Sequence, residues 1–254
     1  MSPKRESNVG AVARAMANFG LDDLWLVAPR CRLGREAAAL AVHGAHLLKS
    51  STSVPTLDDA VSDRTLVVGT SARQRAFDEH AAVSPETAIA RLHGQAGALV
   101  FGPEDFGLDN AALDRCDLVV TIPTAAYASL NLAQATVLLA YLWFRDRSSP
   151  AAVTSHQGTE DHRARAPSQP PQRGQLEAML QQFEELALRS GYSDELRRTS
   201  MMRHMRRILR RAAADADDVT RLRGLWSQLG GALERAERAT EGVATPAAAE
   251  DDTP

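Results

Sequence analysis

Apolar residues follow two different periods along the first part of the chain. Short runs of strand length, rich in Val and Leu, occupy residues 24–28, 65–69, 98–102 and 118–122. Between these runs apolar residues recur at helical spacing, over residues 11–19, 35–42, 85–93 and 130–144. Strands that alternate with helices need crossover connections, which produce a parallel sheet covered by helices on both faces. The pattern therefore predicts an α/β domain over residues 1–147.

The pattern changes after this domain. Residues 148–174 lose periodicity and are rich in Pro, Ser, Gln, Gly and Arg, which is typical of a flexible linker. Helical periodicity returns at residues 175–190, 194–211 and 217–238, so we expect a helical C-terminal extension over residues 175–240. Residues 241–254 are rich in Ala, Thr, Pro and acidic residues, and we expect them to form a disordered tail.

Polar side chains gather after two of the predicted strands and near the N-terminus. Glu104 follows the run at 98–102, while Ser129 and Asn131 follow the run at 118–122. Loops at strand ends are where binding and catalytic residues concentrate. Purely structural roles are also possible for these residues. Asn8 could be the N-cap of the helix at 11–19, with Arg14 on its surface, and Ser129 could be the N-cap of the helix near residue 130, with Asn131 in its first turn. Glu104 could cap a short helix near Asp109 or form an ion pair.

Three blocks carry these residues in order: NVGAVARAM from Asn8, FGPEDFGL from Phe101 and IPTAAYASLNLAQA from Ile122. Together they resemble the SPOUT (TrmH-type) RNA 2′-O-ribose methyltransferases. The sequence GTSAR from Gly69 and the helical extension are similar to the TrmJ-like branch, which methylates nucleotide 32 of the tRNA anticodon loop. The resemblance implies a SPOUT α/β knot, in which a parallel sheet is flanked by helices and the C-terminal part of the domain forms a trefoil knot.

The resemblance also implies a cofactor, S-adenosyl-L-methionine, held by loops at the carboxyl ends of strands. The matching positions are Thr70, Ser71, Ala72, Gly102, Ile122, Ala128, Ser129 and Leu130. Small residues there suit a nucleoside lying against main chain, and Gly102 would permit its close approach. No glycine-rich Rossmann motif or Walker loop occurs in the chain, which argues against a classical Rossmann methyltransferase or an NTPase.

Catalytic roles are implied for Arg14, Asn8, Glu104, Ser129 and Asn131, with the arginine often reaching the site across a homodimer interface. Methyl transfer from a sulfonium needs no metal, so we expect none. Arg14 either takes the proton of the ribose hydroxyl or stabilises the developing alkoxide. The second role is favoured because a guanidinium is a poor base.

One departure from the family concerns the N-terminus. Family members begin with an apolar strand before the first block, whereas only residues 1–7 precede Asn8 here. Either the true start lies upstream or this chain lacks a strand that the family uses. Ribosomal RNA as the substrate, and an RNA-binding protein without catalysis, remain the alternatives to a tRNA methyltransferase.

Charge and composition indicate which partners the protein binds. The net charge of −3 argues against a nucleic-acid ligand, but seven arginines fall in a segment without any acid: Arg197, Arg198, Arg203, Arg206, Arg207, Arg210 and Arg211. Interleaved apolar residues predict that this helix packs through one side and offers arginines to RNA phosphates from the other. We therefore expect tRNA as a partner. Without a membrane segment or signal peptide, a cytoplasmic protein is expected.

Overall fold

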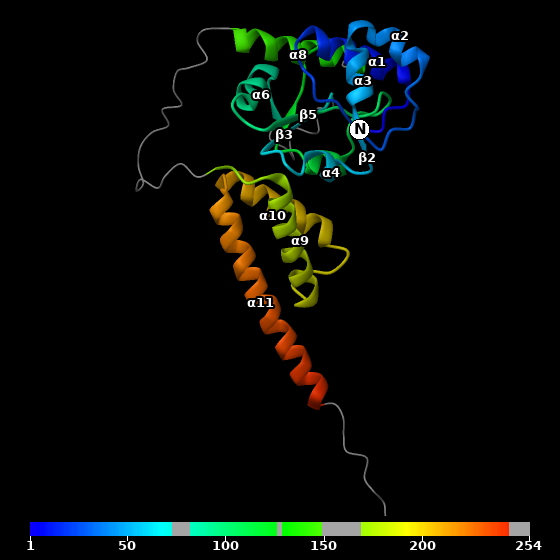
Figure 1. Cartoon of the computed structure of the whole chain (residues 1–254). Coiled ribbons are helices and arrows are strands. Elements are labelled where there is room, and N and C mark those ends of the chain that lie inside the picture. The colour runs from blue at the N-terminus through cyan, green and yellow to red at the C-terminus, as the bar shows by residue number, and fades with distance from the viewer. Residues whose placement is uncertain (73–81, 126–128, 149–168, 244–254) are drawn as a thin grey trace, which may run out of the picture. The chain divides into compact units, whose positions relative to one another are not determined.

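The computed structural model describes residues 1–72, 82–125, 129–148 and 169–243. The chain divides into two compact units (Figure 1). The first, here the α/β unit, comprises residues 1–165 and 172–174. The second, here the helical unit, comprises residues 166–171 and 175–254.

All strand pairs described in the α/β unit are parallel, as the alternating pattern predicts. β1 (Trp25–Val27) pairs with β2 (Thr52–Val54) in one sheet. The other sheet has the order β4-β6-β3-β5, with β3 at Leu66–Thr70, β4 at Ala82–Val83, β5 at Gly97–Val100 and β6 at Leu118–Val120. The apolar runs predicted β1, β3, β5 and β6. β2 and β4 were missed because neither forms an apolar run: β2 is mostly exposed, and β4 has only two residues, both partly exposed.

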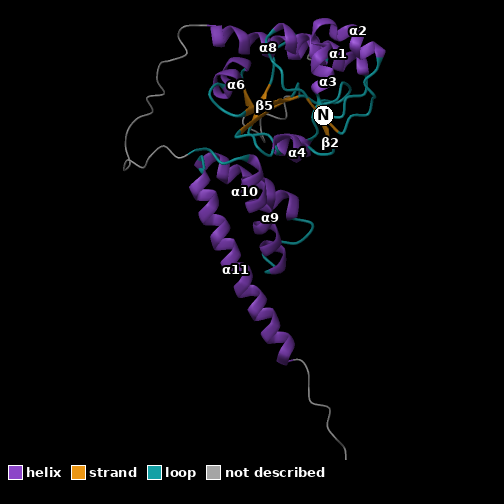
Figure 2. Ribbon diagram, in the orientation of Figure 1, coloured by secondary structure: helices purple, strands orange, loops and turns teal. Residues whose placement is uncertain are grey.

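Helices cover both faces of the larger sheet (Figure 2). Val67 and Val119 point to one face, where α4 (Leu57–Val61) and α7 (Asn110–Asp114) complete the core. Their neighbours Val68 and Val120 point to the other, where α6 (Pro85–Leu92) and α8 (Leu132–Ser148) pack. Because successive side chains of a strand point to opposite faces, each strand is apolar throughout.

Three N-terminal helices pack together with the short 3-10 helix η1 (Val42–Gly44), and the first of them also packs against α8. They are α1 (Glu6–Asn18), α2 (Arg35–Ala41) and α3 (Ala45–Ser50). A Cβ on Gly10 would lie 2.3 Å from the Ala37 carbonyl oxygen, so α1 and α2 cross with their backbones in contact. This crossing fixes α1, which carries Asn8 and Arg14.

The helical unit has its own apolar core. α9 (Arg173–Arg189), α10 (Arg198–Ala212) and α11 (Ala216–Val243) enclose Met179, Leu180, Met202, Leu209 and Val219. α9 begins inside the segment expected to be linker, and α11 ends three residues into the segment expected to be tail. Residues 149–168 and 244–254, where the rest of both expectations falls, lie outside the described residues.

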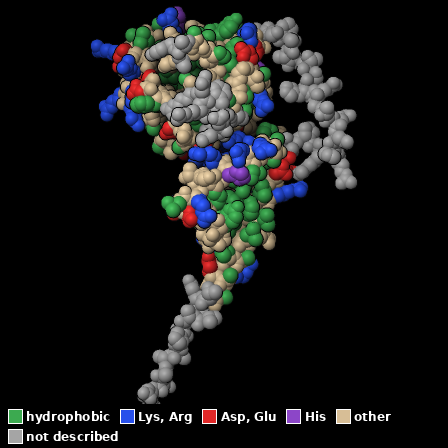
Figure 3. Space-filling model, turned by 180° about the vertical axis from the view of Figure 1, so that it is seen from behind, with side chains coloured by type: hydrophobic (Ala, Val, Ile, Leu, Met, Phe, Trp, Pro, Cys, Tyr) green, Lys and Arg blue, Asp and Glu red, His purple; other side chains and the backbone are tan. Residues whose placement is uncertain are grey.

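Hydrophobic side chains also lie on the surface of the helical unit (Figure 3). They include Tyr192, Leu196, Leu225 and Leu229. None of the helices described in either unit is long and apolar enough to cross a membrane.

Candidate functional site

The loops after β5, β3 and β6 meet at one edge of the sheet. Thr70 Oγ1 donates to the Val100 carbonyl oxygen at 3.1 Å, and the Ser71 amide donates to the Val120 carbonyl oxygen at 3.0 Å. Thr121, which the sequence reasoning missed, donates its hydroxyl to the Ser71 carbonyl oxygen at 2.9 Å. The predicted cofactor positions Thr70, Ser71, Ala72, Gly102 and Ile122 therefore belong to three adjacent strand ends.

Gly102 is required by its own loop. A Cβ there would lie 2.1 Å from the Gly107 carbonyl carbon and 2.2 Å from the Leu108 nitrogen. The loop folds back at Gly107, whose φ of +67° favours glycine. The close main chain of Gly107 and Leu108 is therefore sufficient to require a glycine at position 102, and an approach of the cofactor there stays a prediction.

Glu104 lies against the start of α1. Its carboxylate accepts hydrogen bonds from the Asn8 side-chain amide at 2.8 Å and from the Lys4 and Arg5 backbone amides at 3.2 and 3.3 Å. Desolvation raises the pKa of Glu104, but these hydrogen bonds together outweigh it and hold the pKa below its ordinary value. Glu104 thus accepts from two backbone amides at the start of α1. Arg5 occupies the N-cap position of this helix, but its side chain makes no capping hydrogen bond.

Asn8 links the first block to the third. It lies inside α1, which begins at Glu6, so the prediction that Asn8 is an N-cap is wrong. The helix starts earlier because Glu104 supplies the acceptors at its terminus. Asn8 Oδ1 accepts a hydrogen bond from Asn131 Nδ2 at 3.3 Å. We call Asn8, Glu104 and Asn131 the polar cluster; each comes from a different sequence block.

Asn131 is the residue that caps α8. Its Oδ1 accepts from the Ala133 amide at 2.8 Å, and Gln134 Oε1 accepts from the Asn131 amide at 3.1 Å. The spacing Asn-x-x-Gln is a capping-box signal that the sequence carried and our reasoning did not use. Ser129 is exposed and lies before this cap, so its expected capping role is wrong.

The remaining predicted positions lie apart from the polar cluster or outside the described residues. Leu130 is half-buried beside Asn131, and Ala128 lies outside the described residues. Arg14 is exposed on α1, and no hydrogen bond or ion pair to it occurs among the described residues. It follows Asn8 by six positions, about 9 Å along the helix axis.

The strand-end loops suit a nucleoside. They offer backbone amides and carbonyls, the hydroxyls of Thr70 and Thr121, and the small side chains of Ser71 and Ala72, which leave main chain accessible. Within the described ranges, no group of three or more His, Cys, Asp or Glu side chains is placed to hold a metal ion. The donor set of these loops therefore fits hydrogen bonding to a nucleoside.

The arginine segment is partly neutralised in the folded chain. Arg198 pairs with Glu184 at 2.6 Å and with Glu195 at 3.2 Å, and Arg206 pairs with Glu177. Arg197 pairs with Asp194 at 3.0 Å. The arginines at these positions are thus neutralised, by Glu177 and Glu184 of α9 and by Asp194 and Glu195, which lie just before α10.

Arg207 and Arg211 are exposed on α10, and neither forms an ion pair with an acid in the described part of the helical unit. The Arg207 guanidinium contacts His204 Nδ1 at 2.8 Å, and Arg211 lies in the last turn. The basic surface of α10 therefore centres on these two residues.

Comparison with known proteins identifies the family to which the chain belongs. Residues 1–141 match the model of the SpoU rRNA Methylase family. The chain belongs to this family of methyltransferases. Among curated relatives it is similar to the tRNA (cytidine/uridine-2′-O-)-methyltransferase TrmJ of Yersinia pestis (strain Pestoides F), with 33% identity over 230 residues that cover 87% of this chain and 86% of the relative.

The TrmJ of Citrobacter koseri is 34% identical over 226 residues, which cover 87% of this chain and 90% of the relative. Among solved structures, TrmJ from Z. mobilis ZM4 superimposes with a TM-score of 0.76 and 30% identity, covering 90% of this chain and 96% of that one. A probable methylase family protein from Haemophilus influenzae Rd KW20 gives a TM-score of 0.55 at 26% identity, covering 92% and 95%. The resemblance predicted from the three sequence blocks is confirmed.

Proposed function

We propose that this protein is an S-adenosyl-L-methionine-dependent tRNA methyltransferase that modifies a ribose 2′-hydroxyl. The observation that carries the proposal is the polar cluster, which joins residues of three separate sequence blocks by hydrogen bonds of 2.8 and 3.3 Å. Full-length similarity to TrmJ enzymes supports tRNA as the substrate and C or U as the methylated nucleotide.

The cofactor is proposed to lie on the strand-end loops. Main chain and small side chains would hold it at Thr70, Ser71, Ala72, Gly102, Ile122, Ala128, Ser129 and Leu130. When bound, it supplies a methyl group that is already attached to a good leaving group. The transfer would therefore need no metal, because the donor already carries its leaving group.

The residues of the chain must position the acceptor hydroxyl and stabilise charge on it. Asn8 and Asn131 present amide groups that suit a ribose or a phosphate. Glu104 is a poor candidate for the base, because a lowered pKa weakens it as a proton acceptor and α1 already engages its oxygens. We assign Glu104 the role of holding Asn8, and Ser129 that of a further contact to cofactor or substrate.

Arg14 is proposed to act on the polar cluster of a second protomer. Its distance along α1 from Asn8 leaves it outside the cluster of its own chain, while its exposure makes it accessible to a partner. A guanidinium in this position would stabilise the developing alkoxide.

The homodimer is proposed to form on the outer side of α8. Large apolar side chains are exposed there, namely Val137, Leu138, Tyr141 and Phe144, and Phe19 of α1 packs edge-on against Tyr141 at 6.1 Å. Exposed apolar patches of this kind mark interaction surfaces. α1, which carries Arg14, packs against α8, so a second copy seated here would lie near Arg14.

Finer features follow from the TrmJ resemblance. We propose nucleotide 32 as the target, a trefoil knot in the C-terminal part of the methyltransferase domain (residues 1–147), and a helical extension (residues 175–240) that contacts tRNA. The linker, residues 148–174, would join the two and residues 241–254 would form a tail. Such an enzyme would work in the cytoplasm.

The test is methyl transfer to purified RNAs. The protein and methyl-tritiated S-adenosyl-L-methionine are incubated with unmodified tRNA transcripts and, separately, with ribosomal RNA. We expect label in tRNA alone. Label in ribosomal RNA alone would favour the ribosomal alternative, and RNA binding without label would favour the non-catalytic one.

A further inference from the structure

The segment between β1 and the start of α2 carries a group of positive charges that no acid of the chain neutralises. Arg30, Arg32 and Arg35 are all exposed there, and we call them the loop arginines. Within the described part of the chain, none of them forms an ion pair, even with the neighbouring Glu36. They differ in this respect from most arginines of α10, which pair with acids.

Hydrogen bonds hold the loop arginines beside the start of α1. The Arg30 amide donates to the Pro3 carbonyl oxygen at 2.9 Å. At the other end of the loop, the Ala37 amide donates to Glu6 Oε2 at 3.3 Å. Both ends of the arginine-bearing loop are therefore fixed to residues 3–6, which lead into α1 and the polar cluster.

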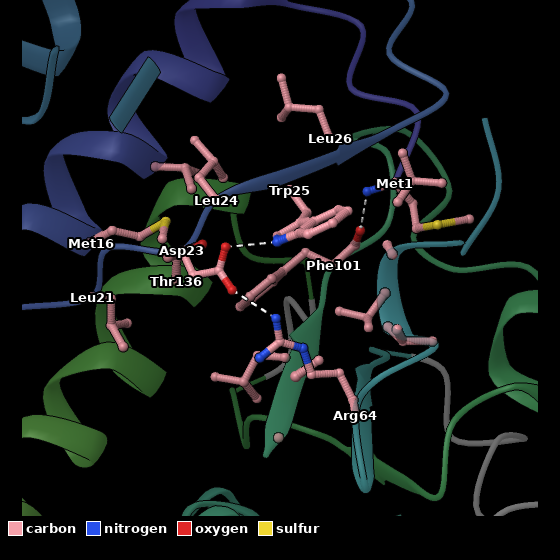
Figure 4. A pocket seen from close by; sticks show the side chains of 18 of the residues that line it. Met1, Met16, Leu21, Asp23, Leu24, Trp25, Leu26, Arg64, Phe101 and Thr136 are labelled. Atoms are coloured by element: carbon pink, nitrogen blue, oxygen red, sulfur yellow. Dashed lines mark hydrogen bonds and ion pairs between the residues drawn. The ribbon is translucent and has the colours of Figure 1, made fainter. Parts of the chain in front are cut away.

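The loop after β5 is fixed to the same first residues. The Met1 amino group donates to the Phe101 carbonyl oxygen at 2.8 Å (Figure 4). Desolvation at this contact lowers the pKa of the amino group from the ordinary value of 8.0 to about 6, against a smaller opposing effect of Glu104. Lys4 donates its backbone amide to Glu104 and pairs through its side chain with Asp105. The loop arginines and the loop after β5 thus contact one short segment at the start of α1.

An exposed aromatic ring lies in the loop after β5, two positions beyond Glu104. The side chain of Phe106 is 71% exposed, more than any other large apolar side chain described in the α/β unit. Lys4 Nζ lies over its ring, 5.6 Å from the centroid. The backbone of this loop is held by the hydrogen bond from the Gly107 amide to the Pro103 carbonyl oxygen at 3.0 Å. Because the ring is already positioned, little entropy is lost when a flat group stacks on it.

Charges and ring together fit a strand of RNA. Guanidinium groups without an acidic partner attract phosphates, and each phosphate contact releases counterions. An aromatic ring stacks on a nucleobase, provided that the base is unpaired. A second protein chain could also cover Phe106, but a strand of phosphates is the partner that neutralises all three loop arginines.

We propose that the loop arginines and Phe106 form the surface on which the substrate RNA lies beside the polar cluster. The arginines bind phosphates of the strand that carries the target ribose, and Phe106 stacks on an unpaired base next to that ribose. Two residues of extended chain span at most about 7 Å, so Phe106 is within reach of a nucleotide adjacent to one at Glu104 and Asn8. This assignment rests on the proposed function and adds a binding surface on the α/β unit.

The test measures the affinity of the full chain, without cofactor, for an RNA hairpin with an unpaired loop and for a fully paired RNA duplex, over a range of salt concentrations. Arg30→Ala combined with Arg32→Ala removes two loop arginines. The matched control is Lys49→Ala combined with Arg91→Ala, which removes two exposed cations. These lie in the last turns of α3 and α6, before β2 and β5, and therefore toward the amino ends of the strands.

Two further variants separate stacking from charge. Phe106→Ala removes the ring, whereas Phe106→Trp keeps an aromatic face. Because stacking releases no counterions, these variants should leave the salt dependence unchanged. The mass of each variant in solution is measured by light scattering, and its melting temperature shows that it is folded.

We expect the arginine pair to reduce the slope of log affinity against log salt for the hairpin by about 1–2, and the control pair to leave it unchanged. Phe106→Ala should weaken hairpin binding about tenfold without changing duplex affinity, and Phe106→Trp should bind like the wild type.

An equal change of slope with the control pair, or equal affinities of wild type and Phe106→Ala for the hairpin, would overturn the proposal. An equal loss on hairpin and duplex would also overturn it. So would a lower mass of Phe106→Ala in solution, because the ring would then lie between protein chains. These affinities do not depend on methyl transfer, so a chain that shows the expected pattern but transfers no methyl group would refute the proposed function alone.

Discussion

The carboxylate of Glu104 holds both the start of a helix and a side chain of the polar cluster. Its oxygens accept from the Lys4 and Arg5 amides and from Asn8 Nδ2. Hydrogen bonds to an ionised acceptor are stronger than neutral ones. The position of Asn8 therefore depends on the charge of Glu104 as well as on its reach.

We predict that Glu104→Gln lowers the free energy of unfolding by about 1–2 kcal/mol, because an amide has one acceptor oxygen where three donors converge. Methyl transfer should fall as well, with little change in cofactor affinity. The matched control is Asp105→Asn, which removes an exposed carboxylate paired with Lys4 and should leave the free energy of unfolding nearly unchanged. Urea denaturation measures both; equal losses would contradict a special role for Glu104.

The Met1 amino group predicts a pH dependence of stability. Its pKa of about 6 in the folded chain lies below the ordinary 8.0, so the folded state binds fewer protons between these values than the unfolded state. Stability should therefore rise from pH 6 to pH 8, by up to about 2 kcal/mol, and the penalty should be complete below pH 6.

Acetylation of the amino group provides the control, because the acetylated nitrogen keeps an N–H for Phe101 and loses the charge. Denaturation midpoints are compared between pH 6 and pH 8 for both forms, on protein whose intact Met1 is verified by mass spectrometry. Histidine titration is common to the two forms and cancels in the difference. Identical pH slopes would contradict the burial of a charged terminus.

At the scale of elements, α10 shows how folding redistributes charge. Its arginines form an acid-free run in the sequence, but Glu177 and Glu184 of α9 pair with Arg206 and Arg198. Paired charges release few counterions when RNA binds. The RNA-binding capacity of α10 should then rest on Arg207 and Arg211.

We predict that Arg207→Ala combined with Arg211→Ala weakens tRNA binding and reduces the slope of log affinity against log salt by about 1–2. Arg198→Ala is the matched control, since its charge is neutralised by Glu184 and Glu195. Filter binding over a range of salt concentrations measures both. A loss with Arg198→Ala as large as with the double variant would contradict this assignment.

The elements differ in how far the sequence predicts them. β1, β3, β5 and β6 are buried on both faces, so their apolar runs were visible. The start of α1 was misplaced because Glu104, 98 positions after Glu6, supplies its terminal acceptors. The α8 cap was misplaced because Asn131 and Ser129 are both good N-cap residues, and only the Gln134 contact decides between them.

At the scale of the whole molecule, the proposed site needs two copies of the chain. The polar cluster belongs to one protomer, and Arg14 is proposed to come from the other. The family resemblance of the sequence blocks implied both the members of the site and this division between protomers, whereas composition and periodicity alone predicted neither. A dimer on α8 would have twofold symmetry and two equivalent sites.

We predict that Arg14→Ala lowers methyl transfer roughly a hundredfold without changing the melting temperature. Arg91→Ala, an exposed arginine of α6, is the control and should leave activity unchanged. Equal mixing of Arg14→Ala and Asn8→Ala subunits should restore about a quarter of wild-type activity, since half of the dimers are mixed and each has one intact site. Wild-type activity of the Arg14→Ala homodimer, or no recovery on mixing, would contradict a shared site.

The central claim is that the polar cluster serves transfer of a methyl group to a ribose oxygen of tRNA. The most direct measurement is mass spectrometry of nucleosides released from tRNA after incubation with the protein and isotopically labelled S-adenosyl-L-methionine. The account predicts label in a 2′-O-methylated cytidine or uridine, and its loss when Asn8 is replaced by Ala. Label on a base, or no label in tRNA with folded protein that binds both cofactor and tRNA, would contradict it.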